Sequence, residues 1–176
     1  MEGLTGDYSR SELILLEYHT TDSLGTNKTK QLFRDYNLIG TPTVVFNGSS
    51  DVMPGPKTSY VYKSRINSLL KEQISTALLT ANAQLGNDIL VSVEITNLST
   101  KAIENARLFV VVYEDLNTEL NHYVVRDIGS AKTVTMPGHS TSSFQIESGE
   151  RYSSDKHVVV MLKSTGGSIL QSVFVV

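Results

Sequence analysis

The pattern of apolar and polar residues changes near the middle of the chain. Residues 1–75 combine one continuous apolar run with two segments of helical spacing, whereas residues 76–176 alternate apolar and polar side chains. The alternation is clearest over Ile89–Asn97, where every second residue from position 89 to 95 is β-branched and apolar. A period of two is typical of a strand with one buried face. We therefore predict two domains, 1–75 and 76–176.

The second domain has the pattern of an all-β protein. Clusters of Gly, Asn and Ser separate its apolar runs, and no segment has a convincing helical period. The number and spacing of the runs predict an immunoglobulin- or fibronectin-like β-sandwich. The eight strand candidates are Ala77–Leu85, Ile89–Asn97, Arg107–Glu114, Asn121–Asp127, Lys132–Met136, Ser140–Glu147, His157–Lys163 and Ser168–Val176.

The first domain mixes strands and helices. The apolar run Glu12–His19 is typical of a strand covered on both faces. A helix follows, capped by Thr26 or Asn27. Next comes a strand over Thr43–Phe46, whose Asn-Gly turn predicts a hairpin with a short return strand around Val52-Met53. Ser59 caps a second helix with one apolar stripe, formed by Tyr62, Ile66, Leu69, Leu70 and Ile74.

The segment Gly40-Thr41-Pro42, which precedes the predicted strand Thr43–Phe46, resembles the cis-proline loop of a thioredoxin fold. The order strand, helix, Gly-Thr-Pro strand, hairpin strand, helix resembles the latter part of that fold. The resemblance implies a cis Thr41–Pro42 bond and an α/β plus all-β protein, in which a truncated thioredoxin-like unit precedes the sandwich. The opening β-α unit, which carries a Cys-x-x-Cys pair in the fold, is missing because residues 1–11 are too short and polar.

The run Leu15–His19, followed by Asp22 and by the motif Gly40–Gly48, resembles a family of bacterial exported or outer-membrane-associated proteins. In that family a thioredoxin-like domain precedes an immunoglobulin-like sandwich. The resemblance implies a periplasmic, cell-surface or extracellular location, although residues 1–7 do not form a signal peptide. It leaves two functional hypotheses: a non-catalytic protein, or a fragment, that acts in protein interaction, and the C-terminal portion of a thiol-disulfide oxidoreductase whose Cys-x-x-Cys lies upstream.

Composition excludes several functions for this polypeptide. It contains no cysteine, so thiol exchange and thiolate-metal sites are excluded. A net charge of −3 without a Lys/Arg cluster argues against nucleic-acid binding. No apolar run approaches the roughly 20 residues of a membrane-spanning helix. The four histidines lie far apart and no Gly-rich phosphate loop is present, so we expect neither a metal nor another cofactor.

Two pairs of residues are candidates for binding, and none is a candidate for catalysis. His19 and Asp22 follow a predicted strand at its carboxyl end, where open α/β sheets place ligands. Their alternative role is local, with His19 capping the strand and Asp22 beginning a turn. Thr41 and Pro42 could shape a groove for a partner, or could simply be a feature of the fold.

The missing first strand predicts self-association. In a thioredoxin sheet that strand lies between the strands that correspond to Leu13–His19 and Thr43–Phe46. Each buried main-chain group left unpaired costs about 1–3 kcal/mol. Three repairs are open: the two strands pair directly, a second copy donates a strand, or an upstream peptide fills the gap. An unpaired edge is also a template for another chain, so we expect a two-fold dimer with Leu13–His19 near its interface. The protein partner itself cannot be read from the sequence.

Overall fold

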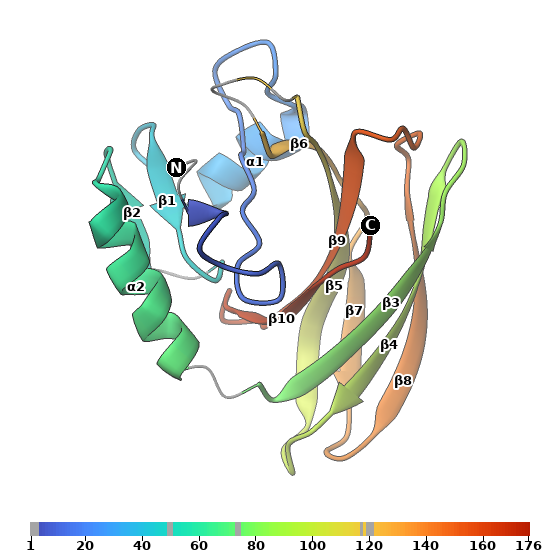
Figure 1. Ribbon diagram of the computed structural model, residues 1–176. Helices are drawn as coiled ribbons and strands as arrows, with labels where there is room; N and C mark the ends of the chain where they lie inside the picture. The colour runs from blue at the N-terminus through green and yellow to red at the C-terminus, as the bar shows by residue number, and fades with distance from the viewer. Residues whose placement is uncertain (1–3, 49–50, 73–74, 117, 119–121) are drawn as a thin grey trace.

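The computed structural model describes residues 4–48, 51–72, 75–116, 118 and 122–176. Its two helices lie in the N-terminal part, and most of its strands lie in the C-terminal part (Figure 1). In chain order the elements are α1 (Asn27–Asp35), β1 (Thr43–Val45), β2 (Val52–Pro54), α2 (Ser59–Glu72), β3 (Ala77–Gln84), β4 (Ile89–Asn97), β5 (Ile103–Glu114), β6 (Val124–Ile128), β7 (Lys132–Met136), β8 (Thr141–Ser148), β9 (Lys156–Lys163) and β10 (Ile169–Phe174).

The C-terminal part consists of two antiparallel sheets packed face to face (Figure 1). One has five strands in the order β10-β9-β5-β6, with β7 also paired to β5, and the other has the order β3-β4-β8. The predicted alternation holds on β4, where Ile89, Val91, Val93 and Ile95 are buried between the sheets. All eight predicted strands are present, although β5 begins earlier, at Ile103. The predicted start of the fourth strand, Asn121, lies outside the described residues.

Strand β5 is the centre of the five-stranded sheet. Its first half pairs with β7 and its second half with β6, while β9 runs along its other side. Val110, Val111 and Val112 are all completely buried, although successive strand residues point to opposite faces. The five-stranded sheet is therefore covered on both faces: the second sheet covers the inner face, and the N-terminal part covers the outer one.

The predicted strand over Glu12–His19 is wrong. This segment is extended, but it forms a single bridge, in which Glu17 lies parallel to Val124 of β6. The Glu17 N–H donates to the Tyr123 carbonyl at 2.7 Å, and the Val125 N–H donates to the Glu17 carbonyl at 2.9 Å. The segment therefore borders β6 and does not pair with β1, whose partner in the two-stranded sheet is β2. The free edge of β6 supplies main-chain partners to Glu17, whereas β1 supplies none to this segment in the part of the chain that the structure describes.

The extended segment also seals the outer face of the five-stranded sheet. Side chains at alternate positions, those of Ile14, Leu16 and Tyr18, pack against a cluster that we call the outer-face cluster. Its buried members come from three strands of the sheet: Val111, Tyr113, Val125 and Val159. The two parts of the molecule thus share a hydrophobic layer, in addition to the core between the sheets.

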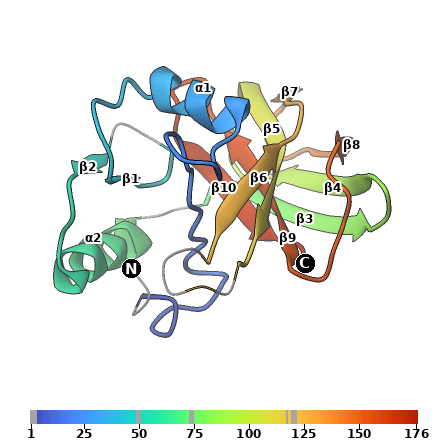
Figure 2. The ribbon, with the colours of Figure 1, turned by 90° about the horizontal axis from the view of Figure 1, so that it is seen from above.

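The helices begin close to the predicted positions. Thr26 caps α1 and accepts from the Thr29 N–H, and the Thr29 hydroxyl accepts from the Thr26 N–H. Helix α2 begins at Ser59, the residue predicted as its cap, and buries Tyr62 and Ile66. Ile74 of the predicted stripe lies outside the described residues. Seen from above, β1 lies between α1 and α2 (Figure 2).

Candidate functional site

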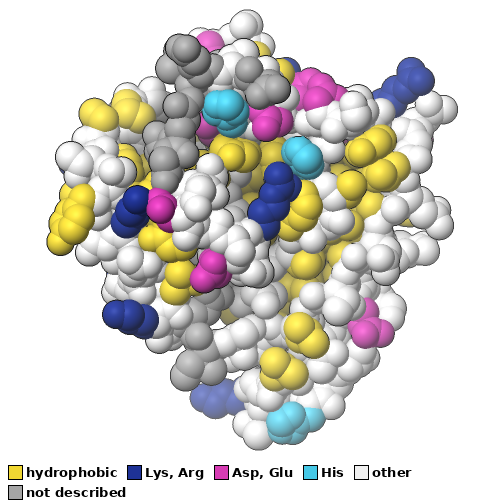
Figure 3. Space-filling view, in the orientation of Figure 1, with side chains coloured by type: hydrophobic (Ala, Val, Ile, Leu, Met, Phe, Trp, Pro, Cys, Tyr) yellow, Lys and Arg dark blue, Asp and Glu magenta, His cyan; other side chains and the backbone are white. Residues whose placement is uncertain are grey.

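A cleft of about 1020 Å³ lies between the N-terminal part and the outer face of the five-stranded sheet. We call it the interlayer cleft. Apolar side chains line most of it, and hydrophobic patches reach the surface on the face seen in Figure 3. Concave apolar sites with a few polar groups are the usual form of ligand and peptide sites. The lining side chains that the following argument uses are Leu32 and Phe33 of α1, Leu69 and Leu70 of α2, Phe109 of β5 and Met161 of β9.

An ion pair joins α1 to β6 at one end of the interlayer cleft. Lys28 Nζ donates to Asp127 Oδ1 at 2.5 Å and to the Ile128 carbonyl at 2.7 Å. The other carboxylate oxygen of Asp127 accepts from the Ser148 hydroxyl at 2.8 Å. The Asp127 side chain is only 11% exposed, so these partners take the place of solvent around its carboxylate. The ion pair therefore fixes α1 against the sheet.

A second contact joins the β1–β2 hairpin to β10 and β9. The Ile169 N–H donates to the Asn47 carbonyl at 2.7 Å. Lys163 Nζ lies 4.6 Å from the centre of the Tyr36 ring and donates to its hydroxyl at 3.1 Å. The Tyr36 hydroxyl in turn donates to the Gly48 carbonyl at 3.1 Å. A side chain at position 48 would place its Cβ 2.9 Å from Ile169, so glycine allows the hairpin to approach the sheet.

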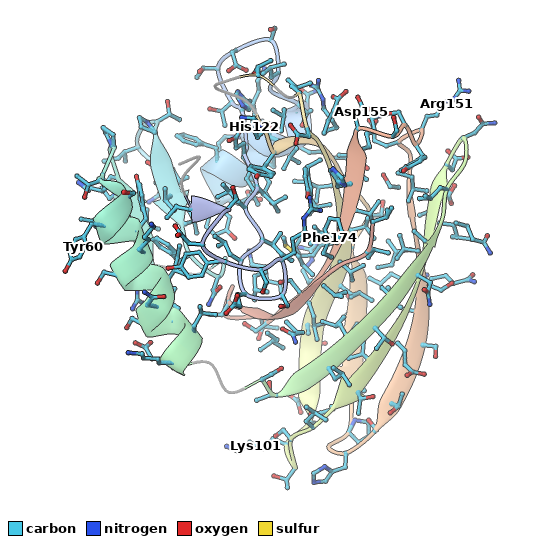
Figure 4. The ribbon with its side chains drawn as sticks, in the orientation of Figure 1. Tyr60, Lys101, His122, Arg151, Asp155 and Phe174 are labelled. Carbon is cyan, nitrogen blue, oxygen red and sulfur yellow. The ribbon has the colours of Figure 1, made fainter. Side chains whose placement is uncertain are left out.

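A third contact lies at the end of β10. The Arg10 guanidinium lies 4.1 Å from the centre of the Phe174 ring, a cation–π geometry. Phe174 lies between β10 and the N-terminal part (Figure 4). The Arg10 guanidinium also donates to the Tyr113 hydroxyl at 3.4 Å. Burial raises the pKa of Tyr113, and the positive charge of Arg10 opposes that rise. The cleft walls are therefore held at three separate places.

The structure brings together the predicted pair His19 and Asp22. Nδ1 of the imidazole lies 2.6 Å from Asp22 Oδ2. The hydrogen bond from His19 lowers the pKa of Asp22, and bonds from the Leu24 and Gly25 N–H groups act in the same direction. The sequence reasoning missed Glu17, whose carboxylate lies 3.9 Å from His19 Nε2. The signal was available, because residues two apart in an extended chain lie on the same side.

Thr41 and Pro42 lie in an exposed loop. The Thr41–Pro42 peptide bond is cis, and the Pro42 carbonyl accepts from the Gly55 N–H at 2.8 Å. Thr41 lines the interlayer cleft. Tyr18 and Thr20, which precede and follow His19 in the chain, also line it. His19, Asp22 and Pro42 are not among the lining residues. Of the four candidate residues, Thr41 alone therefore lines the cleft, and the structure does not bring the four together into a single site.

Neither a metal site nor a membrane-spanning helix is found in the part of the chain that the structure describes. No group of three or more His, Asp or Glu side chains there is close enough to hold an ion. No helix among those residues is long and apolar enough to cross a membrane. The burial of Tyr18, which lines the cleft, raises the pKa of its hydroxyl.

Similar folds occur in bacterial proteins of known structure. HBP35 of Porphyromonas gingivalis superimposes with a TM-score of 0.63 at 14% identity, over 84% of this chain and 57% of that one. The crystal structure of a protein from Agrobacterium tumefaciens gives a TM-score of 0.53 at 18% identity, over 92% of this chain and 79% of that one. Both likenesses concern the fold alone.

A third, weaker similarity is to a domain of the outer membrane lipoprotein Omp28 from Porphyromonas gingivalis. The TM-score is 0.41 at 15% identity, over 58% of this chain and 88% of that domain. No protein-family model matches the chain, and none of the curated proteins matches its sequence.

Proposed function

We propose that this chain is a non-catalytic protein of the bacterial cell envelope that acts by binding another protein. In this proposal residues 1–75 are a truncated thioredoxin-like unit and residues 76–176 an immunoglobulin-like sandwich. The observation that carries the proposal is the interlayer cleft, which is large and apolar in a chain without any thiol. The envelope location rests on the resemblance of Leu15–Asp22 and Gly40–Gly48 to exported proteins.

Photo-crosslinking in cells tests protein binding. Phe109 lines the interlayer cleft, so benzoylphenylalanine at this position would react with a bound partner. The same group at Leu78, which is 48% exposed on β3, is the matched control. We expect one dominant adduct, identified by mass spectrometry, from position 109 only. Equal adducts from both positions, or none from either, would contradict the proposal.

In the alternative hypothesis, this chain is the C-terminal portion of a thiol-disulfide oxidoreductase. It requires a Cys-x-x-Cys segment upstream, because the thiolate is the reacting species. We expect the polypeptide itself neither to reduce insulin disulfides nor to oxidise a reduced, unfolded protein. Activity above buffer in either assay would overturn the non-catalytic assignment. The sequence of the gene immediately before Met1 separates the two functions most cheaply, since a Cys-x-x-Cys there favours the enzyme.

A further inference from the structure

We propose that Asn47 is a site of spontaneous modification, at which conversion to isoaspartate releases the β1–β2 hairpin from β10. This reaction goes beyond the proposed function, since it needs no partner protein. Three features of the hairpin turn support it: the residue that follows Asn47, the accessibility of the two reacting groups, and the contact that the turn makes with the five-stranded sheet.

The first feature is the dipeptide Asn-Gly. Asn47 is the one asparagine in the sequence that glycine follows. The side-chain amide carbon of an asparagine and the main-chain nitrogen of the next residue can close a five-membered ring. Because Gly48 has no Cβ, the approach to its nitrogen stays open, whereas a side chain at that position would crowd it. Asparagine is also one of the thermally labile residues of proteins.

The second feature is that both reacting groups are accessible. Asn47 is exposed, and its side-chain amide forms no hydrogen bond with the residues that the structure describes. The Gly48 N–H likewise has no acceptor within the described ranges. Neither the amide carbon nor the nitrogen therefore has to leave a hydrogen-bond partner before the two react.

The third feature is the contact between the turn and the sheet. The Asn47 carbonyl accepts from the Ile169 N–H at 2.7 Å. The backbone of Asn47 is left-handed, with a φ of 48°. In a left-handed residue the following nitrogen lies on the far side of the Cα–C bond from Cβ, so ring closure requires rotation about that bond. The rotation turns the Asn47 carbonyl away from Ile169. The contact therefore slows the reaction, and undocking of the hairpin allows it.

The reaction balances with water as the only co-reactant. The Gly48 nitrogen attacks Cγ of Asn47: the N–Cγ bond forms, the Cγ–Nδ2 bond breaks, and ammonia leaves with the proton of the Gly48 amide. Water then opens the ring at one of its two carbonyl carbons. Opening at Cγ gives aspartate, whereas opening at the main-chain carbon gives isoaspartate. In isoaspartate the main chain runs through the former side chain and is longer by a methylene group.

Isoaspartate at position 47 cannot restore the contact with the sheet. The former main-chain carbonyl is now part of a free carboxylate, and the added methylene displaces Gly48. The turn has little room for this displacement, because even a Cβ on Gly48 would lie 2.9 Å from the Ile169 side chain. The Gly48 carbonyl also loses its position opposite the Tyr36 hydroxyl, which donates to it at 3.1 Å. The modification therefore removes one of the three contacts that hold the cleft walls.

Peptide mapping of the aged protein tests the site. The protein is incubated in warm, mildly alkaline buffer, and isoaspartate is located by mass spectrometry after proteolysis. Asn37 and Asn105 are internal controls, because both are exposed and left-handed, with φ of 51° and 52°, and are followed by leucine and alanine. We expect isoaspartate at position 47 and none at position 37 or 105.

The variant Y36F tests whether the contact controls the rate. It removes the hydroxyl that donates to the Gly48 carbonyl and keeps the ring beside Lys163. We expect modification at position 47 to be about fivefold faster, because the loss of a hydrogen bond favours undocking. Y60F is the matched control, since Tyr60 is 78% exposed and points away from the rest of the molecule (Figure 4). It should leave the rate unchanged.

Hydrogen exchange tests the release of the hairpin. Anion exchange isolates the isoaspartate form, and freshly purified N47D carries the same charge on an ordinary main chain. We expect the Ile169 amide to exchange about fivefold faster in the isoaspartate form and at the original rate in N47D. The proposal is overturned by no isoaspartate at position 47, by equal amounts at positions 37 and 105, by equal rates in Y36F and Y60F, or by unchanged exchange at Ile169.

Discussion

Lys28 of α1 and Asp127 of β6 form an ion pair whose Nζ–Oδ1 distance is 2.5 Å, and this pair joins the two parts of the molecule across 99 positions of sequence. Lys28 is half exposed, whereas Asp127 is nearly enclosed. An ion pair of this kind contributes chiefly by keeping the enclosed carboxylate from being left without a partner. The cost of losing it therefore falls on Asp127.

Replacing Lys28 by methionine should detach α1 from the sheet. The change keeps most of the side-chain volume and removes the charge, leaving Asp127 with the Ser148 hydroxyl. We expect a loss of about 1–2 kcal/mol in the free energy of unfolding and faster hydrogen exchange in α1. Lys101, in a turn far from the cleft (Figure 4), is the control, and K101M should leave both measurements unchanged. Equal effects of the two variants would contradict the role of the ion pair.

The core between the sheets should depend strongly on Leu108 of β5. This side chain is completely buried, so L108A leaves a cavity and should destabilise the protein by about 2–5 kcal/mol in urea unfolding. Leu78 of β3 is 48% exposed and serves as the matched leucine. The change L78A should cost less than about 0.5 kcal/mol. A small effect at Leu108 would show that the sheets can close over the cavity.

Asp22 should titrate at a lower pH than an ordinary aspartate because of its hydrogen bond to His19. Its pKa lies below 3.8 in the folded protein, so the folded state favours the ionised form. The corresponding stabilisation is complete above that value and is lost as the pH falls through the lowered pKa. An NMR titration of the Asp22 carboxyl should show this, and H19A should move the pKa back toward 3.8. The control H139N alters a histidine in a distant turn, and a shift of the Asp22 pKa there would point to an indirect effect.

Gly138 should not tolerate a side chain. A Cβ there would lie 2.2 Å from the Thr100 carbonyl oxygen, so one of two adjacent turns must move. Asn97 holds these turns together by donating to the Lys101 and Pro137 carbonyls at 2.8 and 2.9 Å. We expect G138A to lower the free energy of unfolding by about 1–3 kcal/mol. The control G149A adds a Cβ with no atom within 4 Å, and a comparable loss there would contradict the steric explanation.

Self-association through the first domain stays a prediction, with the segment 13–19 near the interface. In this arrangement a second copy has to offer an extended segment to the cleft. Light scattering over a range of concentrations measures it. A mass that rises with concentration in the unaltered protein and stays monomeric in V45P would support it. A monomer at all concentrations, with residues 76–176 no more stable than residues 1–75, would contradict it.

The sequence predicted the elements better than their partners. The alternation over Ile89–Asn97 reflects a strand with one buried and one solvent-exposed face, so the sequence predicted both the strand and its buried residues. The run over Glu12–His19 has the same composition as a two-sided strand, yet only Glu17 forms a bridge. A strand needs neighbours as well as apolar residues, and pairing between positions 17 and 124 has no local signature.

The candidate site shows the same limit. His19 and Asp22 are close in sequence, and their contact could be anticipated. The interlayer cleft could not, because its walls come from α1, α2, β5 and β9, which no motif connects. For the same reason the sequence does not predict the contact between Lys28 and Asp127, although this ion pair joins the two parts of the molecule.

The single bridge at Glu17 also determines the direction in which the neighbouring main-chain groups of its segment point. Because Glu17 directs its N–H and carbonyl toward β6, the adjacent residues Leu16 and Tyr18 direct theirs to the other side of the segment. Both residues line the interlayer cleft. The bridge thereby covers part of the β6 edge, and an exposed strand edge of this kind is otherwise a template for pairing with another chain.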